Sequence, residues 1–168
     1  MLDQKRPQHT RFKKALEQIE KNYDFCIIDN APDINISTIN ALVASDDVLV
    51  PVTIDDFAID GLAELVEQIN NTREDLNPGL RFCGCLITQY DRTNEADEQG
   101  EAYLRDLQRY PLFQTHIRRT LKMKPSTFAR KPILEYSSRC GAARDYKALV
   151  KEYLEMCPNR TQNQEAAE

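Results

Sequence analysis

Glycine is scarce in this chain and is missing from its beginning. Five glycines occur in 168 residues, and none lies among the first 28. A phosphate-binding loop of the form GxxxxGK[ST] is therefore absent from these residues. No apolar run approaches the ~20 residues of a membrane span, and residues 1–20 lack the apolar stretch of a signal peptide. These absences predict a cytoplasmic protein with no membrane partner.

Paired cysteine spacings and clustered metal ligands are also missing. The five cysteines are odd in number and irregularly spaced, which favours reduced thiols. Cys83 and Cys85 alternate within a strand-like run with no second Cys/His pair nearby, so we expect small core residues rather than metal ligands. His9 and His116 are too isolated in the sequence to suggest a metal site or a catalytic dyad.

The chain does contain an ordinary globular composition, with 41% hydrophobic and 29% charged residues. Strand patterns occur at 25–28, 48–52, 81–89 and 112–117. Helical patterns occur at 9–21, 35–45 (with Asp33 or Asn35 as N-cap), 57–73, 95–109 and from Gly141 onward. The helix at 95–109 is expected to turn Ala102, Tyr103 and Leu107 inward. This alternation predicts an α/β fold with a parallel sheet and right-handed connections.

The most informative stretch is YDFCIIDNAPD, residues 23–33. Four apolar residues, Phe25 to Ile28, run without a polar break into Asp29, which predicts a strand buried on both faces of the sheet. An acid at the carboxyl end of such a strand lies where open α/β sheets bind ligands. This layout is typical of a Walker B strand, whose aspartate holds Mg²⁺ beside nucleotide phosphates. A cap for the following helix is the simpler alternative for Asp29.

Charge is distributed unevenly along the chain, whose net charge is −5. From Tyr23 to Asp75 there are twelve acids and one base, whereas from Phe113 to Lys151 there are ten Lys/Arg and two acids. A basic C-terminal third on an acidic chain is a candidate surface for a polyanion. Solvated helix faces with a few ion pairs are the alternative interpretation.

Three blocks of the sequence, taken in order, carry a family resemblance. They are YDFCIIDNAPDINISTINALVASDDVLVPV, then DDFAIDGLAELVEQI, then LITQYDRTN followed after a helix by IRRTLKMKPSTFARKPILEYSSRCGAARDYKALVKEYL. From about Tyr23 to Leu154 the chain resembles the ParA/Soj branch of the deviant Walker ATPases, the relatives of MinD that partition plasmids and chromosomes. The resemblance implies a three-layer P-loop-NTPase-like parallel sheet with helices on both faces, truncated at the N-terminus. It divides the chain into an N-terminal lead (1–22), a ParA-like part (23–157) and a disordered tail (158–168).

The chain also departs from the family pattern. The family's phosphate loop and the Asp-rich stretch after its second strand are absent, and the resemblance implies that both would precede Met1. The family's Asp-x-Pro-Pro reads Asp29-Asn30-Ala31-Pro32, so its first proline is missing. The family's IPRN reads as residues 117–120, IRRT, and Arg130 replaces the glycine of GKP.

The resemblance assigns roles to individual residues. It implies that Asp29 is the Mg²⁺ ligand and that a nucleotide site includes Asp29, Pro32, Gln89, Tyr90 and Asp91. For the last three, a strand exit with Asp91 capping the next helix is the alternative. The family uses ATP and Mg²⁺, and whether this chain binds either stays open. The family's non-specific DNA surface corresponds to Arg118, Arg119, Lys122, Lys124, Arg130, Lys131, Arg139 and Arg144.

The implied function is that of a ParA/Soj-like partitioning ATPase, with ATP-dependent dimerisation and non-specific DNA binding. Without the loop's backbone N–H groups, we expect the chain to be unable to hydrolyse ATP alone. The expected partners are DNA, a ParB-like protein, and a second copy or a full-length homologue. One alternative is a non-catalytic dimerisation or DNA-binding module that modulates a full-length homologue. Another is the product of a truncated gene, with no separate role. All of this depends on Asp29 lying at the ends of parallel strands.

Overall fold

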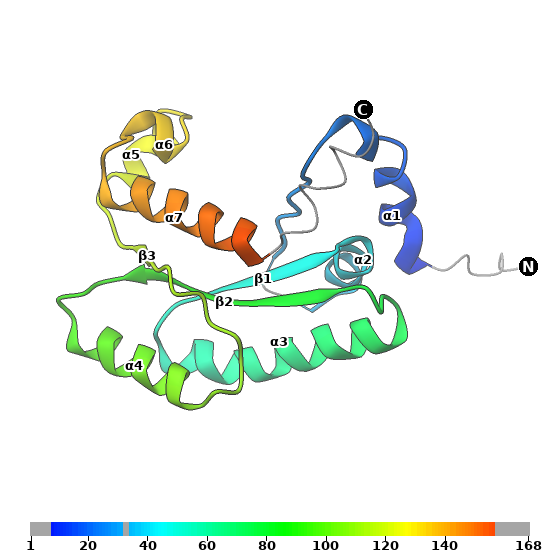
Figure 1. Ribbon diagram of the computed structural model, residues 1–168, viewed down its shortest axis with the longest axis horizontal. Coiled ribbons are helices and arrows are strands. Elements are labelled where there is room, and N and C mark those ends of the chain that lie inside the picture. The colour runs from blue at the N-terminus through cyan, green and yellow to red at the C-terminus, as the bar shows by residue number, and fades with distance from the viewer. Residues whose placement is uncertain (1–7, 32–33, 157–168) are drawn as a thin grey trace, which may run out of the picture. The chain divides into compact units, whose positions relative to one another are not determined.

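The structure, a computed structural model, describes residues 8–31 and 34–156, without the side chains of residues 56–60. Its internal contacts group the chain into two compact units, one formed by residues 1–48 and 60–82 and the other by 49–59 and 83–168 (Figure 1). Within the described ranges, no helix is long and apolar enough to cross a membrane. The predicted tail, 158–168, lies outside the described residues, and the predicted boundary after residue 22 stays a prediction.

The sheet has three parallel strands in the order β1-β2-β3, which confirms the α/β prediction. β1 is Asp47–Val52, β2 is Arg81–Tyr90 and β3 is Ile117–Arg118. Thr88 pairs with Ile117 and Tyr90 with Arg118, with a register shift between the two pairs. Because β2 lies between two neighbours, it is buried along most of its length, from Cys83 to Ile87.

β3 is shorter than the predicted strand at 112–117. Leu112 forms only an isolated bridge with Cys85, and the pairing resumes at Ile117. The backbone between them is held elsewhere, since the N–H groups of Gln114 and Thr115 donate to the Glu152 carboxylate at 2.6 and 2.9 Å. A carboxylate from a distant helix therefore binds both N–H groups, of which a regular strand would direct only one toward β2.

Gly84 allows the connection before β3 to approach β2 closely. Its φ is +134°, and a Cβ at this position would lie 2.8 Å from the carbonyl oxygen of Pro111. The Cys85 N–H donates to that same carbonyl at 2.8 Å. Only glycine combines this backbone conformation with this close approach.

The first unit begins with short helical pieces in place of the single helix predicted at 9–21. They are η1 (Gln8–Thr10), α1 (Arg11–Leu16) and η2 (Glu20–Asn22). Neither α1 nor η2 has a buried residue or a side-chain N-cap, so little packing holds a longer helix together. α2 (Ile36–Ala44) packs against α1 and contributes Ala41, Leu42 and Val43 to the buried core.

Both ends of α2 are fixed by asparagine side chains. Asn35 accepts from the N–H groups of Ser37 at 2.8 Å and Thr38 at 3.3 Å, which makes it the N-cap of the two predicted candidates. The other candidate, Asp33, lies outside the described residues. At the other end, the Asn77 amide donates to the carbonyls of Leu42 at 2.9 Å and Ser45 at 2.7 Å. Asn77, which follows the next helix, thus satisfies the end of this one.

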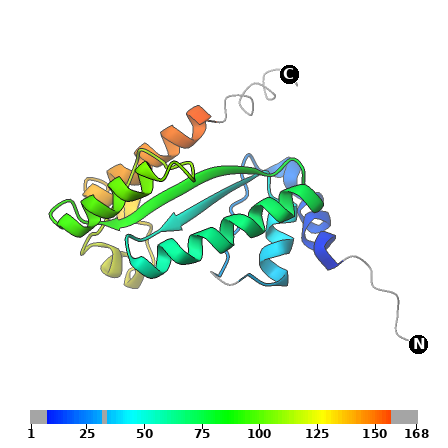
Figure 2. The same ribbon diagram turned by 90° about the horizontal axis from the view of Figure 1, so that it is seen from below.

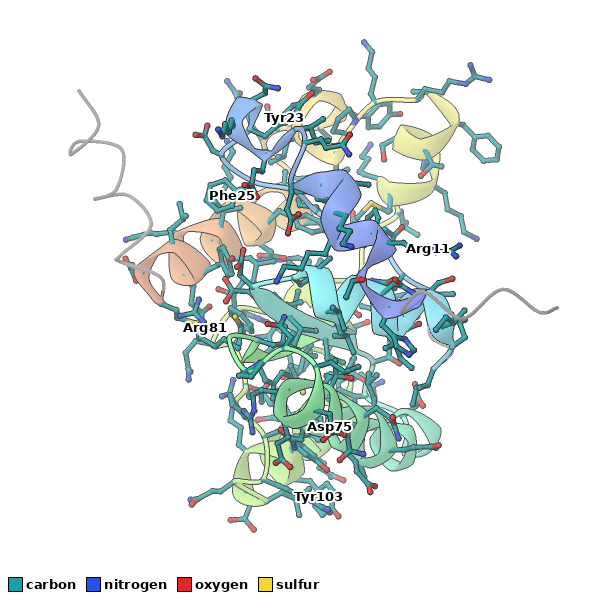
Figure 3. The ribbon with its side chains drawn as sticks, turned by 90° about the vertical axis from the view of Figure 1, so that its right-hand side faces the viewer. Arg11, Tyr23, Phe25, Asp75, Arg81 and Tyr103 are labelled. Atoms are coloured by element: carbon teal, nitrogen blue, oxygen red, sulfur yellow. The ribbon has the colours of Figure 1, made fainter. Side chains whose placement is uncertain are left out.

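α3 (Asp56–Asp75) is one unbroken helix that closely matches the prediction at 57–73 (Figure 2). Leu62, Val66 and Ile69 are buried, as their spacing predicts. α4 (Glu95–Asp106) also forms, but the prediction of its inward face is wrong. Leu104 is its buried residue, whereas Tyr103 points outward (Figure 3), and Leu107, just beyond the helix, is exposed as well.

The second unit closes around its last helix. Two short helices, α5 (Met123–Phe128) and α6 (Ile133–Tyr136), precede α7 (Gly141–Met156). α7 lies beside β3 (Figure 1), and Tyr146, Leu149 and Tyr153 pack on a buried cluster. That cluster consists of Cys83, Leu86, Phe113 and Ile117. Cys83 and Cys85 are both buried, as predicted.

The strand predicted at 25–28 is wrong for this structure. Residues 25–31 form no regular secondary structure, and the side chain of Ile27 is 93% exposed. Tyr23 and Phe25 project outward from the same stretch (Figure 3). No strand of the described residues pairs with it, and an apolar segment without ladder hydrogen bonds has nothing to hold it as a buried strand.

Candidate functional site

Asp29 does not lie at the end of a strand, contrary to the prediction. It is exposed in the loop at 25–31, where the Asn30 amide donates to the carbonyl of Ile28 at 3.3 Å. Pro32 lies outside the described residues. Asp29 belongs to the first unit, whereas Gln89, Tyr90 and Asp91 belong to the second.

The predicted magnesium site has one described ligand, the exposed carboxylate of Asp29. Mg²⁺ prefers octahedral oxygen coordination and is usually held by one or two carboxylates together with substrate phosphates. Across the part of the chain that the structure describes, no three His, Cys, Asp or Glu side chains gather as a possible metal site. The role of Asp29 as an Mg²⁺ ligand stays a prediction.

The end of β2 carries a cluster of buried and partly buried polar side chains. Gln89 is exposed and has a positive φ of 56°. Tyr90 turns the other way and is only 7% exposed, with its ring stacked on His116 at a centroid distance of 4.6 Å. Glu101 lies below this pair, and its Oε1 atom is 2.8 Å from His116 Nε2 and 2.8 Å from Arg105 Nε. The Tyr90 ring is thus already committed to contacts inside the protein.

The cluster shifts the acidities of its members. Burial raises the pKa of Tyr90, and its hydrogen bond to Glu101 raises it further. For Glu101, burial works against ionisation, but hydrogen bonds from Arg105, Tyr90 and His116 outweigh it and lower the pKa. An ionised Glu101 with three donors holds the α4 helix to the end of β2.

Asp91 organises the turn that follows β2. Its Oδ1 atom accepts from the N–H of Thr93 at 3.0 Å and from its hydroxyl at 2.7 Å. These hydrogen bonds lower the pKa of Asp91. The N-cap of α4 is Asn94, which accepts from the Ala96 N–H at 3.1 Å. The alternative in which Asp91 caps this helix is therefore wrong, and Asp91 instead holds the turn that precedes the helix.

Arg118 differs from the rest of the predicted DNA-binding set. Its Nε and Nη2 atoms each lie 2.7 Å from the Asp145 carboxylate, and its backbone N–H donates to Asp145 at 3.1 Å. Asp145 is buried on α7, and Gly141 leaves room for the Arg118 side chain to pass. This guanidinium joins β3 to α7 and is engaged within the protein.

The remaining seven predicted residues are exposed. They are Arg119, Lys122, Lys124, Arg130, Lys131, Arg139 and Arg144. From Ile117 to Leu134 the sequence contains no acid. These residues give the second unit a basic surface. We call the part of it from Arg119 to Lys131 the basic segment.

The cluster formed by Tyr90, Glu101, Arg105 and His116 could not be predicted from the sequence. These residues come from β2, α4 and the connection before β3, and His116 lies fifteen positions from its partner Glu101. No local pattern links them. The only available signal was that Glu101 and Arg105 are spaced i, i+4 on one helix.

Comparison with known proteins connects these features to a family. Residues 1–82 match a family model described as an AAA domain. The chain is 37% identical to the sporulation initiation inhibitor protein Soj of Bacillus subtilis over 146 residues, covering 84% of this chain and 56% of Soj. It is 34% identical to the chromosome partitioning protein ParA of Caulobacter vibrioides, covering 86% of this chain and 55% of ParA. The chain is a member of the ParA/Soj-type family. It spans about half the length of these curated relatives.

Solved structures support the fold. The cobyrinic acid a,c-diamide synthase of Mycobacterium smegmatis with bound ADP and magnesium superposes with a TM-score of 0.66 and 27% identity, over 70% of this chain and 48% of the synthase. The cell division ATPase MinD of Pyrococcus furiosus gives a TM-score of 0.71 at 15% identity, over 88% of this chain and 59% of MinD, and so supports the fold alone. The ParA/Soj-type chain thus has a P-loop-ATPase-like α/β fold, although its predicted Walker B strand is not formed.

Proposed function

We propose that this ParA/Soj-type chain binds duplex DNA without sequence preference and serves the partitioning of a chromosome or plasmid. The observation that carries the proposal is the exposed, acid-free basic segment in a chain whose relatives are partitioning proteins. Lys and Arg side chains on such a surface contact phosphates, which gives salt-dependent and sequence-independent affinity.

A titration of random-sequence duplex DNA, followed by fluorescence anisotropy at several salt concentrations, tests this proposal. Each phosphate contact contributes about 0.9 to the slope of log affinity against log salt. We expect the double substitution Lys122→Gln and Lys124→Gln to weaken binding and to reduce that slope by about 2. The matched control is Lys13→Gln with Lys14→Gln, two exposed lysines on α1. Equal effects of the two double variants would exclude the basic segment as the DNA surface.

ATP hydrolysis by these 168 residues alone is not part of the proposed activity. Phosphoryl transfer depends on positioning the phosphates, and no GxxxxGK[ST] loop occurs in this sequence to do so. We expect phosphate release at the background rate with or without Mg²⁺. A Mg²⁺-dependent rate that Asp29→Ala abolishes would contradict this and would assign Asp29 the metal-binding role.

The alternative function is a non-catalytic module that dimerises with, or modulates, a full-length homologue. The exposed apolar loop at 25–31 favours it, since such a surface is available to a second polypeptide. We propose ATP-dependent dimerisation and binding of a ParB-like partner only for an ATPase that contains a phosphate-binding loop. Sedimentation velocity of the chain alone, with ATP and with a full-length homologue distinguishes these states, and a single monomeric species in all three would remove the modulating role.

A further inference from the structure

Two apolar side chains of the basic segment are almost completely exposed. Leu121 is 92% exposed and Phe128 is 90% exposed. Of the large apolar side chains that the structure describes, only Ile27 exposes a comparable fraction, at 93%. A leucine and a phenylalanine in contact with water over nearly their whole surface gain free energy from any apolar environment that receives them.

Phe128 ends a short helix, and Leu121 lies just before that helix begins. α5 is Met123–Phe128, with Lys122 as its N-cap and Ala129 as its C-cap, and six residues separate Leu121 from Phe128. Ser126 is 3% exposed and therefore marks the side of α5 that faces the protein. At about 100° per residue, Phe128 lies roughly 160° around the helix axis from Ser126 and so faces away from the protein. Leu121, just before the helix, is also directed into solvent, as its exposure shows.

Cations surround this apolar pair. Lys122 and Lys124 lie between Leu121 and Phe128, and Arg130 and Lys131 follow directly. All four are exposed, and no acid occurs from Ile117 to Leu134. An apolar tip ringed by positive charge is complementary to a surface that is anionic outside and apolar inside.

Apolar surface continues onto the neighbouring helices. α6 packs against both α5 and α7, and between α6 and α7 lies an open groove of about 490 Å³. Its lining is apolar apart from one lysine and consists of Pro132, Ile133, Leu134, Tyr146, Lys147 and Val150. The exposed apolar area of this part of the second unit is thus larger than two side chains.

We propose that the basic segment docks on the surface of an anionic lipid bilayer. Leu121 and Phe128 enter the boundary between headgroups and acyl chains, while Lys122, Lys124 and the neighbouring cations face the anionic headgroups. The prediction of no membrane partner was based on the absence of a membrane-spanning segment. Docking on the surface of a bilayer does not require such a segment. Duplex DNA satisfies the cations equally well, but its phosphates offer nothing to a leucine, and Leu121 has no aromatic face to stack on a base.

Sedimentation of the full chain with lipid vesicles tests this inference. We expect binding to vesicles that contain phosphatidylglycerol and none to vesicles of phosphatidylcholine alone. Leu121→Ser combined with Phe128→Ser should weaken binding at least about tenfold, because two apolar anchors are lost. Lys122→Gln combined with Lys124→Gln should weaken it about thirtyfold. Ile27→Ser, an equally exposed apolar residue outside the segment, is the matched control and should leave binding unchanged.

The outcomes separate this inference from the proposed function. The apolar double variant should keep the duplex DNA affinity and salt slope of the unmodified chain, since its cations remain. No binding to anionic vesicles, or unchanged binding by the apolar double variant, would refute docking on the bilayer. Parallel loss of vesicle and DNA binding in that variant would also refute it and would assign Leu121 and Phe128 to the nucleic-acid surface. Vesicle binding without any DNA binding would refute the proposed function alone.

Discussion

Replacing Asp145 by asparagine should destabilise the second unit, because this carboxylate joins β3 to α7. The variant keeps the shape of the side chain but removes the charge that receives three hydrogen bonds from Arg118. Hydrogen bonds to a charged group contribute about 1.5–3 kcal/mol each when buried. The Arg118 side chain is 41% exposed, however, and can be rehydrated when its partner is lost. We therefore expect a loss of about 2 kcal/mol in the free energy of unfolding.

The pH dependence of this difference has a definite sign. Burial works against ionisation of Asp145, but the hydrogen bonds and charge of Arg118 prevail and hold its pKa below the ordinary value of 3.8. A carboxyl group with a lowered pKa in the folded state stabilises the fold above its unfolded pKa. That contribution is lost as the pH falls through the folded pKa. The two proteins should thus differ most at neutral pH and converge in strong acid.

Urea unfolding followed by circular dichroism measures both effects. At neutral pH the loss corresponds to a decrease in Tm of about 4–8 °C for a chain of this size. Asp106→Asn, at an exposed acid that ends α4, is the matched control and should change stability by less than about 0.5 kcal/mol. Equal destabilisation by the two substitutions, or a difference that persists unchanged in strong acid, would refute the role assigned to the Asp145 carboxylate.

Three further predictions concern other parts of the second unit and one exposed cysteine. Glu101→Gln should lower the free energy of unfolding by about 1–2 kcal/mol at neutral pH, with the difference shrinking below the ordinary pKa of glutamate; a constant difference in urea titrations across that range would contradict the lowered pKa. Gly141→Ala would place a Cβ against the Arg118 side chain and should cost about 1–2 kcal/mol, so an unchanged Tm would mean that the side chain moves aside freely. Burial raises the pKa of Cys85 to about 11, so mass spectrometry should find iodoacetamide on the exposed Cys26 long before Cys85; equal rates in the native protein would contradict the burial.

Local patterns predicted most of the regular elements. Asn35 has the side chain that a helix start requires, and its cap forms as expected. The spacing of Leu62, Val66 and Ile69 likewise identified the buried side of α3. In these places, the interactions that determine the structure involve residues close together in the chain.

The predictions failed where a distant residue decides the structure. The apolar run at 25–28 predicts burial, but a strand also needs a neighbouring strand, and none of the described strands pairs with it. The strand predicted at 112–117 is interrupted because Glu152, on the last helix, takes its N–H donors. The same limit applies to the candidate site, where His116 and Glu101 meet across two elements and bury the ring of Tyr90.

The close approach at Gly84 makes this position a marker for the course of a neighbouring loop. A protein of similar fold that carries any side chain at the equivalent position has no room for the carbonyl of Pro111. Its connection from α4 to β3 must then bow outward, and the bridge between Cys85 and Leu112 disappears with it. Residue type at this one position and loop path should therefore vary together among homologues.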